Sequence, residues 1–407
     1  MIKKLLFFAF ILIVSFHAGF KGYRLYQERQ PIHLYMDIAT IPSFLQMIEF
    51  VKAPQQDKKY IAWRRFPDRE QFFDLNAFNA HEIKMPVYES AYKEAYETLD
   101  KAVSEIVQEN PHARFIIHAN LRHPHNTLEP ALKHLAPSQI KEIHLYEDGL
   151  GNIAEVWRKY ATSQYNWTDA CVQHIKDFQN AKIDTLRPHD VFCMNRLYPT
   201  IYHISFVDYL KKESDFEDFF KYINETHIVP IDFHNISKEL SPQQKKFLYA
   251  MVGFNDTQYK QVIKGKHTLF YTLGWLQEQS DNILLVDIFN KLKNNELKSL
   301  LDDSSGVLFF KAHPATAAKP MTDELMEDNK DAYVFSRNIP LEILIIAGLE
   351  PDYLLGFSST IFFAFQPKTI LYYLTIEDDK NLPLLKKLNI LSDEKVIDIH
   401  NFIHKER

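Results

Sequence analysis

Two adjacent acidic residues, Glu147 and Asp148, directly follow the apolar run "IHLY" and precede Gly149. A carboxylate at the end of a buried strand lies at the edge of a sheet, where burial and neighbouring charges can tune its pKa. Such a group can act as a general base. A solvated turn is the alternative, because Asp and Gly favour turns for their own reasons. The residue types alone leave both interpretations open.

A second group follows the apolar run "GVLFF" and consists of Lys311, His313 and Pro314. Pro314 has no backbone N–H and so prevents the chain from continuing as a paired strand. A single His is more often a structural residue than a catalyst. Beside a lysine and a helix start, however, it suits a phosphate site, with Lys311 as a point charge and His313 as a proton donor.

A third group, Ser358-Ser359-Thr360, stands where the strand-like run "YLLGF" gives way to "IFFAF". Ser and Thr are common helix N-caps, which is the structural interpretation. The same hydroxyls, with free backbone N–H groups at a helix start, also bind phosphate. The pattern G-x-S-x-G is not satisfied, which argues against a serine-hydrolase nucleophile.

Three histidines in "HANLRHPH", His118, His123 and His125, raise the question of a metal site. Apart from Glu129, four residues after His125, they have no acidic or Cys partner at helical spacing, and the chain contains no D-x-D pattern. A phosphorylated donor would then be held by basic side chains and helix dipoles instead of a bridging ion. We therefore expect neither a metal nor a resident cofactor.

Composition excludes several classes of protein. The chain has 407 residues with a net charge of −6, so we expect no nucleic-acid partner. No P-loop pattern and no complete G-x-G-x-x-G occurs, and the relaxed Gly149-x-Gly151-x-x-Ala154 is weak evidence by itself. The two cysteines, Cys171 and Cys193, could pair if the chain is exported, or remain as free buried thiols.

The N-terminus has the layout of an export signal, because Lys3 and Lys4 precede an apolar run from Leu5 to Phe16. This run is shorter than the ~20 residues of a membrane span, but an uncleaved anchor is the alternative. We expect residues 1–25 to be a signal peptide or membrane anchor. The protein would then be exported or anchored, with membrane association through this segment.

The rest of the chain alternates short apolar runs with amphipathic stretches, which predicts parallel βαβ units. Strands are expected in Ile32–Asp37 and Arg114–Asn120, and a strand followed by a polar turn is expected within Gly306–Pro314 and within Tyr353–Phe365. With a boundary near residue 190, the result is two doubly wound domains that face a central cleft. Asp148, His123, His313 and Ser358 each come just after a strand, where ligands of such sheets bind.

At these motifs the sequence resembles the bacterial sialyltransferases of glycosyltransferase family 80, typified by enzymes of marine Photobacterium and Vibrio and of Pasteurella. The matching residues are Glu147-Asp148-Gly149, His313-Pro314 and Ser358-Ser359, and "VGFNDTQ" and "PLEILIIAGLEPD" also match. The resemblance implies a GT-B fold with two Rossmann-like domains. It assigns residues 30–189 plus 380–407 to the acceptor and residues 190–379 to the donor, CMP-sialic acid.

The resemblance also implies roles for individual residues. Asp148 matches the general base, and His313 matches the general acid that protonates or stabilises the departing phosphate. The implied donor-binding residues are Lys311, Pro314, Glu342, Ser358 and Ser359. The implied acceptor-binding residues are Arg65, His123 and Trp275. The family usually has Asp at the position of Glu147, a difference that leaves the base at Asp148 unaffected.

The reaction implied is inverting transfer of sialic acid from CMP-sialic acid to the hydroxyl of a galactose-terminated glycan such as lactose. The α2,3 linkage is favoured over α2,6, because family members with α2,6 activity often carry an extra N-terminal immunoglobulin-like domain. Here the family-like sequence already begins at about residue 31, which leaves no room for such a domain. We expect a monomer in the periplasm or cell envelope. The alternatives are a non-catalytic sialoglycan- or nucleotide-binding protein of the same fold and a transferase of another CMP-activated acid sugar.

Overall fold

The computed structural model describes residues 30–66, 73–86, 92–149, 170–205, 207–273, 286, 289–293, 306–313, 325–327, 329–357, 359, 361–365, 369–375, 382–387 and 389–398. The predicted export segment, Trp275, Pro314 and Ser358 lie outside these residues. Of the helices within them, none is long and apolar enough to cross a membrane.

The first sheet has seven parallel strands in the order β3-β2-β1-β4-β5-β6-β7. Its strands are β1 (Ile32–Asp37), β2 (Lys58–Trp63), β3 (Ala80–Glu82), β4 (Phe115–Asn120), β5 (Ile140–Tyr146), β6 (Thr200–Ser205) and β7 (Ile228–Ile231). Every residue of β1 and β4 is buried, as expected of central parallel strands covered on both faces. The strands predicted at β1 and β4 are confirmed.

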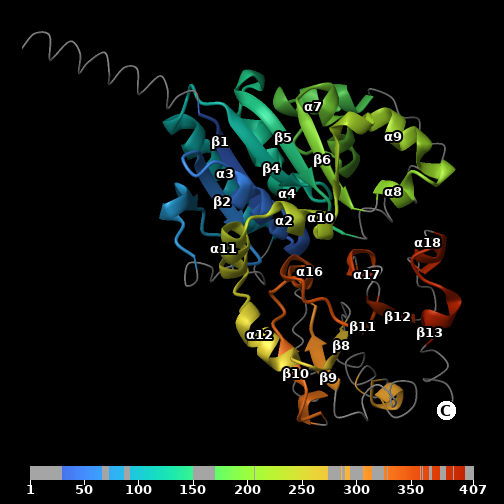
Figure 1. The fold of residues 1–407 in the computed structure, drawn as a ribbon. Coiled ribbons are helices and arrows are strands. Elements are labelled where there is room, and N and C mark those ends of the chain that lie inside the picture. Colours follow the sequence, from blue (N-terminus) through green and yellow to red (C-terminus); the bar gives the residue numbers. More distant parts are fainter. Residues whose placement is uncertain are drawn as a thin grey trace, which may run out of the picture.

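The second sheet has six parallel strands in the order β10-β9-β8-β11-β12-β13. They are β8 (His267–Thr272), β9 (Gly306–Lys311), β10 (Tyr333–Phe335), β11 (Tyr353–Gly356), β12 (Ile370–Thr375) and β13 (Val396–Asp398). The two sheets form separate lobes, one above the other in Figure 1. The expected strands after residues 306 and 353 are therefore present, and the architecture is α/β.

The change from one sheet to the other comes after β7, not near residue 190. β6 pairs with β5 and β7 pairs with β6, so the expected boundary would divide the first sheet. The C-terminal assignment is wrong for β13, which pairs with β12 in the second sheet, and residues 399–407 lie outside the described residues. Lys387 does contact the first lobe, since its Nζ lies 3.2 Å from Glu213 Oε2.

Helices cover the sheets and join the lobes. They are α2 (Thr40–Lys52), α3 (Tyr92–Glu109), α4 (Pro124–Thr127), α5 (Glu129–His134), α7 (Ala170–Gln179), α8 (Val207–Leu210), α9 (Glu217–Ile223), α10 (Phe233–Glu239), α11 (Pro242–Val252), α12 (Asp256–Ile263), α16 (Ile343–Ala347), α17 (Ile361–Ala364) and α18 (Leu382–Lys387). In α3 the buried residues Ala95, Leu99, Val103 and Ile106 recur every three or four positions, which places them on one helix face. α16 ends at Gly348, whose φ of 67° favours glycine.

The two lobes contact each other mainly through α10, α11 and α16 (Figure 1). His234 Nε2 lies 2.9 Å from Glu350 Oε2, and the Ser237 hydroxyl donates to the Ile346 carbonyl over 2.9 Å. One apolar core continues from the first sheet through α16 to one face of the second sheet. A separate cluster covers the other face of that sheet. The lobes are therefore joined by packed apolar side chains as well as by polar contacts.

A row of aromatic and imidazole rings crosses one face of the first sheet, on four neighbouring strands. The rings belong to His33, Tyr35, His118, His144, Tyr146 and His203. Hydrogen bonds join His33 Nδ1 to His118 Nε2 (3.1 Å) and His118 Nδ1 to the Tyr146 hydroxyl (2.7 Å). Burial lowers the pKa of His33 to about 3 and holds the pKa values of His118 and His203 well below the ordinary range. These imidazoles are therefore neutral at pH 7.

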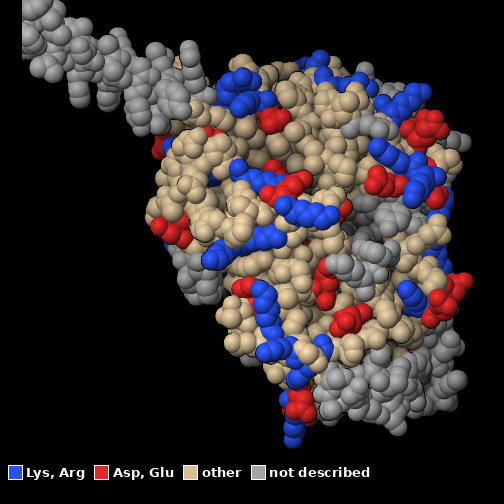
Figure 2. All heavy atoms as spheres, in the orientation of Figure 1, with Lys and Arg blue, Asp and Glu red and all other residues tan. Residues whose placement is uncertain are grey.

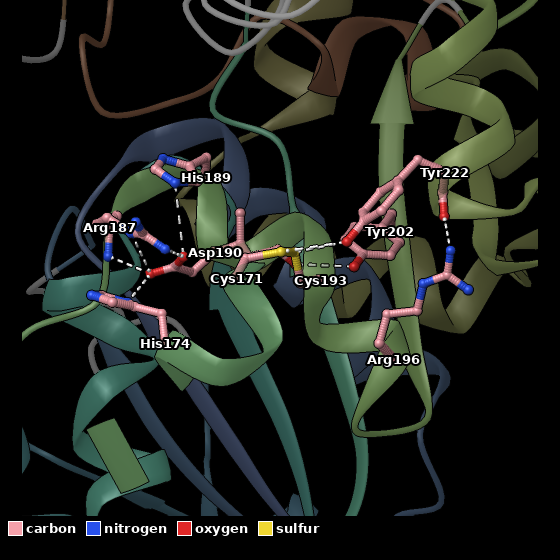
Figure 3. The surroundings of a disulfide bond; sticks show 10 residues. Cys171, His174, Arg187, His189, Asp190, Cys193, Arg196, Tyr202 and Tyr222 are labelled. Carbon is pink, nitrogen blue, oxygen red and sulfur yellow. Dashed lines mark hydrogen bonds and ion pairs between the residues drawn. A yellow bond between two sulfur atoms is a disulfide. The ribbon is translucent and has the colours of Figure 1, made fainter. Parts of the chain in front are cut away.

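Cys171 and Cys193 form a disulfide that joins α7 to the 3₁₀ segment η5 (Pro188–Arg196), with 6.1 Å between their Cα atoms (Figure 3). The Tyr222 hydroxyl lies within hydrogen-bond distance of both sulfur atoms. Near the disulfide, the buried Asp190 carboxylate accepts hydrogen bonds from Arg187 and lies 2.6 Å from His174 Nδ1. Of the two states left open by the sequence, the structure has the paired one.

Replacing both cysteines with alanine is expected to lower the free energy of unfolding by about 3 kcal/mol, because the cross-link closes a loop between positions 22 residues apart. Urea denaturation of the oxidised protein and of the Cys171→Ala/Cys193→Ala variant measures the difference. Reductant should destabilise the wild type and leave the variant unchanged. Equal stability of the two oxidised proteins would contradict a stabilising disulfide.

Charged side chains are mixed over the face of the molecule seen in Figure 2, where Lys and Arg alternate with Asp and Glu. The described part of this face has no continuous basic field of the kind that tracks a nucleic-acid backbone. The charges on this face therefore do not indicate a ligand site. The candidate functional residues lie instead at the carboxyl ends of the strands.

Candidate active site

The carboxyl ends of β1, β4 and β5 meet at one edge of the first sheet, because the three strands are parallel neighbours. Asp37 ends β1, Asn120 ends β4, and Glu147 and Asp148 follow β5 directly. Residues far apart in the sequence thus place polar side chains at one edge. This is the position where open parallel sheets bind ligands.

The three residues of Glu147-Asp148-Gly149 differ in their surroundings, and each residue type suits its own position. Glu147 is fully buried and accepts hydrogen bonds from the Ser205 backbone N–H (2.7 Å) and the Ser205 hydroxyl. Burial raises the pKa of Glu147 to about 7, against the lowering effect of the Ser205 hydrogen bonds. Gly149 has a φ of 71°, where a side chain would be strained. Between them, the Asp148 side chain keeps 17% of its surface exposed.

Asp148 contacts His123, whose Nε2 lies 3.3 Å from Asp148 Oδ2. His123 occupies the cap position before α4, where Pro124 fits the first helical turn. The His123 side chain is 32% exposed, so both partners remain open to solvent. The pair therefore combines a carboxylate that can accept a proton with a neighbouring imidazole that can contact a bound hydroxyl.

On the second sheet, Lys311 ends β9 and His313 follows two residues later. Lys311 is buried and donates to the Arg337 carbonyl over 2.8 Å. Burial lowers the pKa of Lys311 to about 7, while the Glu342 carboxylate opposes this effect. Glu342 lies at the start of α16, and burial raises its pKa to about 7. The positive charge of Lys311 acts in the opposite direction and lowers the Glu342 pKa. These two groups therefore share one buried site.

Ser359 lies at the same edge, between β11 and α17, and its hydroxyl accepts a long hydrogen bond (3.4 Å) from the Ile361 N–H. The register aligns Lys311, Thr272 and Gly356 across β9, β8 and β11, so these three strands end together. A Cβ on Gly356 would lie only 2.8 Å from the Thr272 carbonyl oxygen. Glycine is thus needed where the chain turns toward Ser359.

His313 connects the two lobes electrostatically. Burial lowers the pKa of His313 to about 4, and the positive charges of Arg65 and Lys311 lower it further. Asp148 opposes them, because its negative charge favours the protonated imidazole. Arg65 comes from the turn after β2 in the first lobe. Groups from both lobes therefore act on one imidazole.

The structure thus brings six of the expected site residues into two connected groups, and Ser359 lies at the edge of the second. Asp148, His123 and Arg65 belong to the first lobe, and Lys311, His313 and Glu342 belong to the second. Trp275, Pro314 and Ser358 fall outside the described residues. In the part of the chain that the structure describes, no three His, Cys, Asp or Glu side chains are arranged to hold a metal ion.

Comparison with known proteins assigns the chain to a family. A family model described as "Sialyltransferase PMO188" matches residues 32–401. The chain belongs to this sialyltransferase family. It is therefore a member of a class of glycosyltransferases, and the resemblance inferred from three short motifs is confirmed. A search of curated protein sequences gave no match.

Solved structures of Photobacterium sialyltransferases have the same fold. One is the P. damselae domain described as GT-B (19% identity, 90% of this chain and 99% of that chain covered, TM-score 0.76). Another is the α/β-galactoside α-2,3-sialyltransferase of P. phosphoreum (19% identity, 91% of this chain and 99% of that chain covered, TM-score 0.74). A third is the 2,6-sialyltransferase of Photobacterium sp. JT-ISH-224, in a complex with CMP and lactose (20% identity, 90% of this chain and 78% of that chain covered, TM-score 0.74). This sialyltransferase thus has the predicted GT-B fold.

Two polar residues at the carboxyl ends of central strands in the first sheet were not singled out from the sequence. Asp37 and Asn120 are fully buried and joined by a hydrogen bond of 3.1 Å, although 83 residues separate them in the chain. The signal that singled out Asp148, a polar residue at the end of a buried strand, applies equally to both. Their importance depends on the contact between them, which the sequence does not reveal.

Proposed function

We propose that this sialyltransferase is an inverting enzyme that moves sialic acid from CMP-sialic acid to a galactoside hydroxyl. The acceptor oxygen attacks the anomeric carbon as its proton passes to the Asp148 carboxylate. The bond from that carbon to the CMP phosphate oxygen breaks, and His313 gives a proton to the departing phosphate. Attack opposite the leaving group inverts the anomeric configuration, and both protons are accounted for.

What supports the proposal is that Asp148 and His313 each directly follow a central strand of their own sheet, with Asp148 and Arg65 of the first lobe close enough to His313 to affect its protonation. A carboxylate from one sheet and an imidazole from the other can act on opposite sides of one sugar bond only if they share a site. In the proposal, the first lobe holds the acceptor through His123 and Arg65. The second lobe holds the donor through Lys311, Glu342 and Ser359.

The reaction can be tested directly with CMP-sialic acid and lactose. CMP release together with a sialylated product is the expected result, and it should persist in EDTA because no metal is required. NMR of the product reports the linkage, for which we propose α2,3. Donor binding without product would favour a binding protein instead. Competition with other CMP-activated acid sugars would identify a different donor.

We also propose that the N-terminal segment directs the chain out of the cytoplasm or anchors it to the membrane. The disulfide between Cys171 and Cys193 supports this proposal, because disulfides form and persist in oxidising compartments. Cell fractionation and N-terminal sequencing of the mature protein test it. A reduced, uncleaved protein in the cytoplasm would contradict it.

Protonation of His313 is expected to accompany donor binding. With a pKa of about 4, this imidazole is neutral at pH 7 in the free protein. A bound phosphate favours the charged form and raises that pKa. Between the two pKa values, binding takes up a proton, so the affinity for CMP should increase as the pH falls from 7.5 to 5.5.

Calorimetry in buffers of different ionisation enthalpy measures this proton uptake. The second pKa of a phosphate monoester is about 6, so CMP itself contributes to the signal. The His313→Ala variant has the same contribution from CMP, and the difference between the two proteins isolates the imidazole. Identical proton uptake by both proteins would contradict protonation of His313.

A further inference from the structure

Asp37 is held rigidly at the end of β1. Its side chain is fully buried, and Oδ1 accepts hydrogen bonds from the Ala39 N–H (2.8 Å) and Asn120 Nδ2 (3.1 Å). Oδ2 accepts from Gln46 Nε2 over 3.1 Å. Gln46 is fixed in turn, because its Oε1 accepts from Trp63 Nε1 over 2.9 Å. The carboxylate is therefore a fixed point on the sheet.

Asn120 connects this fixed point to the His123 loop. Its Nδ2 faces Asp37, and its Oδ1 accepts from the backbone N–H groups of Arg122 (2.8 Å) and His123 (3.1 Å). The orientation of the amide is defined, because the atom that faces the two backbone N–H groups must be an acceptor and is therefore Oδ1. The Thr127 hydroxyl closes the loop by donating to the His123 carbonyl over 3.1 Å.

We infer that Asp37 and Asn120 form a positioning pair, which sets the His123 loop and, through the 3.3 Å contact of His123 with Asp148, the orientation of the proposed base. This inference rests on the proposed function. Neither residue needs to touch the substrate. The Asp37 pKa, raised mainly by burial and further by the negative charge of Asp148, agrees with a carboxylate set close behind the base.

A positioning role has a signature that a purely structural role lacks. Galactoside transfer needs the acceptor hydroxyl, His123 and Asp148 in one geometry, and a displacement of about 1 Å can cost about 10²-fold in rate. Hydrolysis of CMP-sialic acid by water needs no docked sugar and should suffer less. The ratio of hydrolysis to transfer does not depend on the fraction of folded enzyme, because both reactions occur in the same molecules.

The experiment measures this ratio in the full chain with CMP-sialic acid and lactose. Asn120→Ala and Asp37→Ala should each raise it by roughly 10–100-fold, mainly through a lower kcat for transfer, with CMP affinity unchanged. Asp37→Asn keeps an oxygen for Ala39 and Asn120 but sets its Nδ2 against Gln46 Nε2, so two donors face each other and the ratio should fall between those of the wild type and Asp37→Ala. The double Ala variant should be no worse than the stronger single variant, because both act through one contact.

A matched control is Tyr202→Phe, which removes a buried hydrogen bond to the Val191 carbonyl (2.9 Å) in the same sheet, away from His123. It should leave the ratio unchanged. If transfer and hydrolysis fall together in the Ala variants, or if the ratio matches that of the wild type, the positioning role is overturned. A wild-type protein that forms no sialylated product would instead overturn the proposed function, and the inference with it.

Discussion

The Asp148→Ala variant is expected to transfer sialic acid to lactose about 10²–10⁴-fold more slowly than the wild type, the usual range for loss of a general base. The physical reason is that the acceptor hydroxyl would attack without a group to take its proton. His123, 3.3 Å away, cannot replace the carboxylate fully because Asp148 is the anionic member of the pair. Initial rates of sialylated lactose formation with saturating donor measure the effect.

Two further variants decide whether this loss is specific. Asp148→Asn keeps the size of the side chain and should be as slow as Asp148→Ala. Glu97→Gln changes an exposed carboxylate on α3 and should leave the rate unchanged. Thermal unfolding of all three confirms that they are folded. A near-normal rate for Asp148→Ala would remove this residue from its proposed role.

The His313→Ala variant should also transfer about 10²–10⁴-fold more slowly, because the departing phosphate would leave without a proton donor. Its affinity for CMP should change by less than about tenfold, or about 1.4 kcal/mol. Lys311 and Glu342 supply other contacts on the same lobe in the proposed donor site. Single-turnover rates and CMP titration separate the two effects.

Lys311→Met is the contrasting variant, because it removes the buried positive charge proposed to face the phosphate. It should weaken CMP binding more than His313→Ala does, since charge-assisted contacts are the stronger ones. Loss of CMP binding in His313→Ala, with Lys311→Met unaffected, would exchange the two roles. His313 would then hold the ligand instead of acting as the acid.

The central strands could be predicted because the sequence signals them strongly. Ile32–Asp37 matches β1 at both ends, and the strand predicted from Arg114 differs from β4 by one residue. Central parallel strands are covered on both faces and appear as continuous apolar runs. The end of the short helix α16 has a similar local signal, because Gly348 takes the left-handed conformation that favours glycine.

The division of the chain could not be predicted in the same way. β6 and β7 lie in a stretch rich in aromatic residues and helices, where the order of strands in the sheet gives no local signal. β7 has exposed residues and a proline at the sheet edge, so its sequence "IVPI" does not resemble a buried strand. Strand pairing in space, not the local sequence, determines where the first lobe ends.

For the candidate site too, some residues could be identified from the local sequence and others only from contacts in space. A polar residue just after a buried strand identified Asp148, His123 and His313 from the sequence. Asp37 and Asn120 satisfy the same rule, but their role depends on a hydrogen bond between residues 83 positions apart. The pairing of Cys171 with Cys193 was likewise undecided until the fold brought them together. Composition and spacing find candidates, and contacts in space select among them.

The row of rings across the first sheet has a consequence for where hydrogens reside. A neutral imidazole carries its hydrogen on one nitrogen only. Asp57 Oδ2, 3.4 Å from His33 Nε2, favours the hydrogen on that nitrogen, which leaves His33 Nδ1 to accept from His118 Nε2. His118 Nδ1 must then accept from the Tyr146 hydroxyl. The buried Asp57 carboxylate thereby selects the tautomers on β1 and β4 and the direction of a phenol O–H on β5.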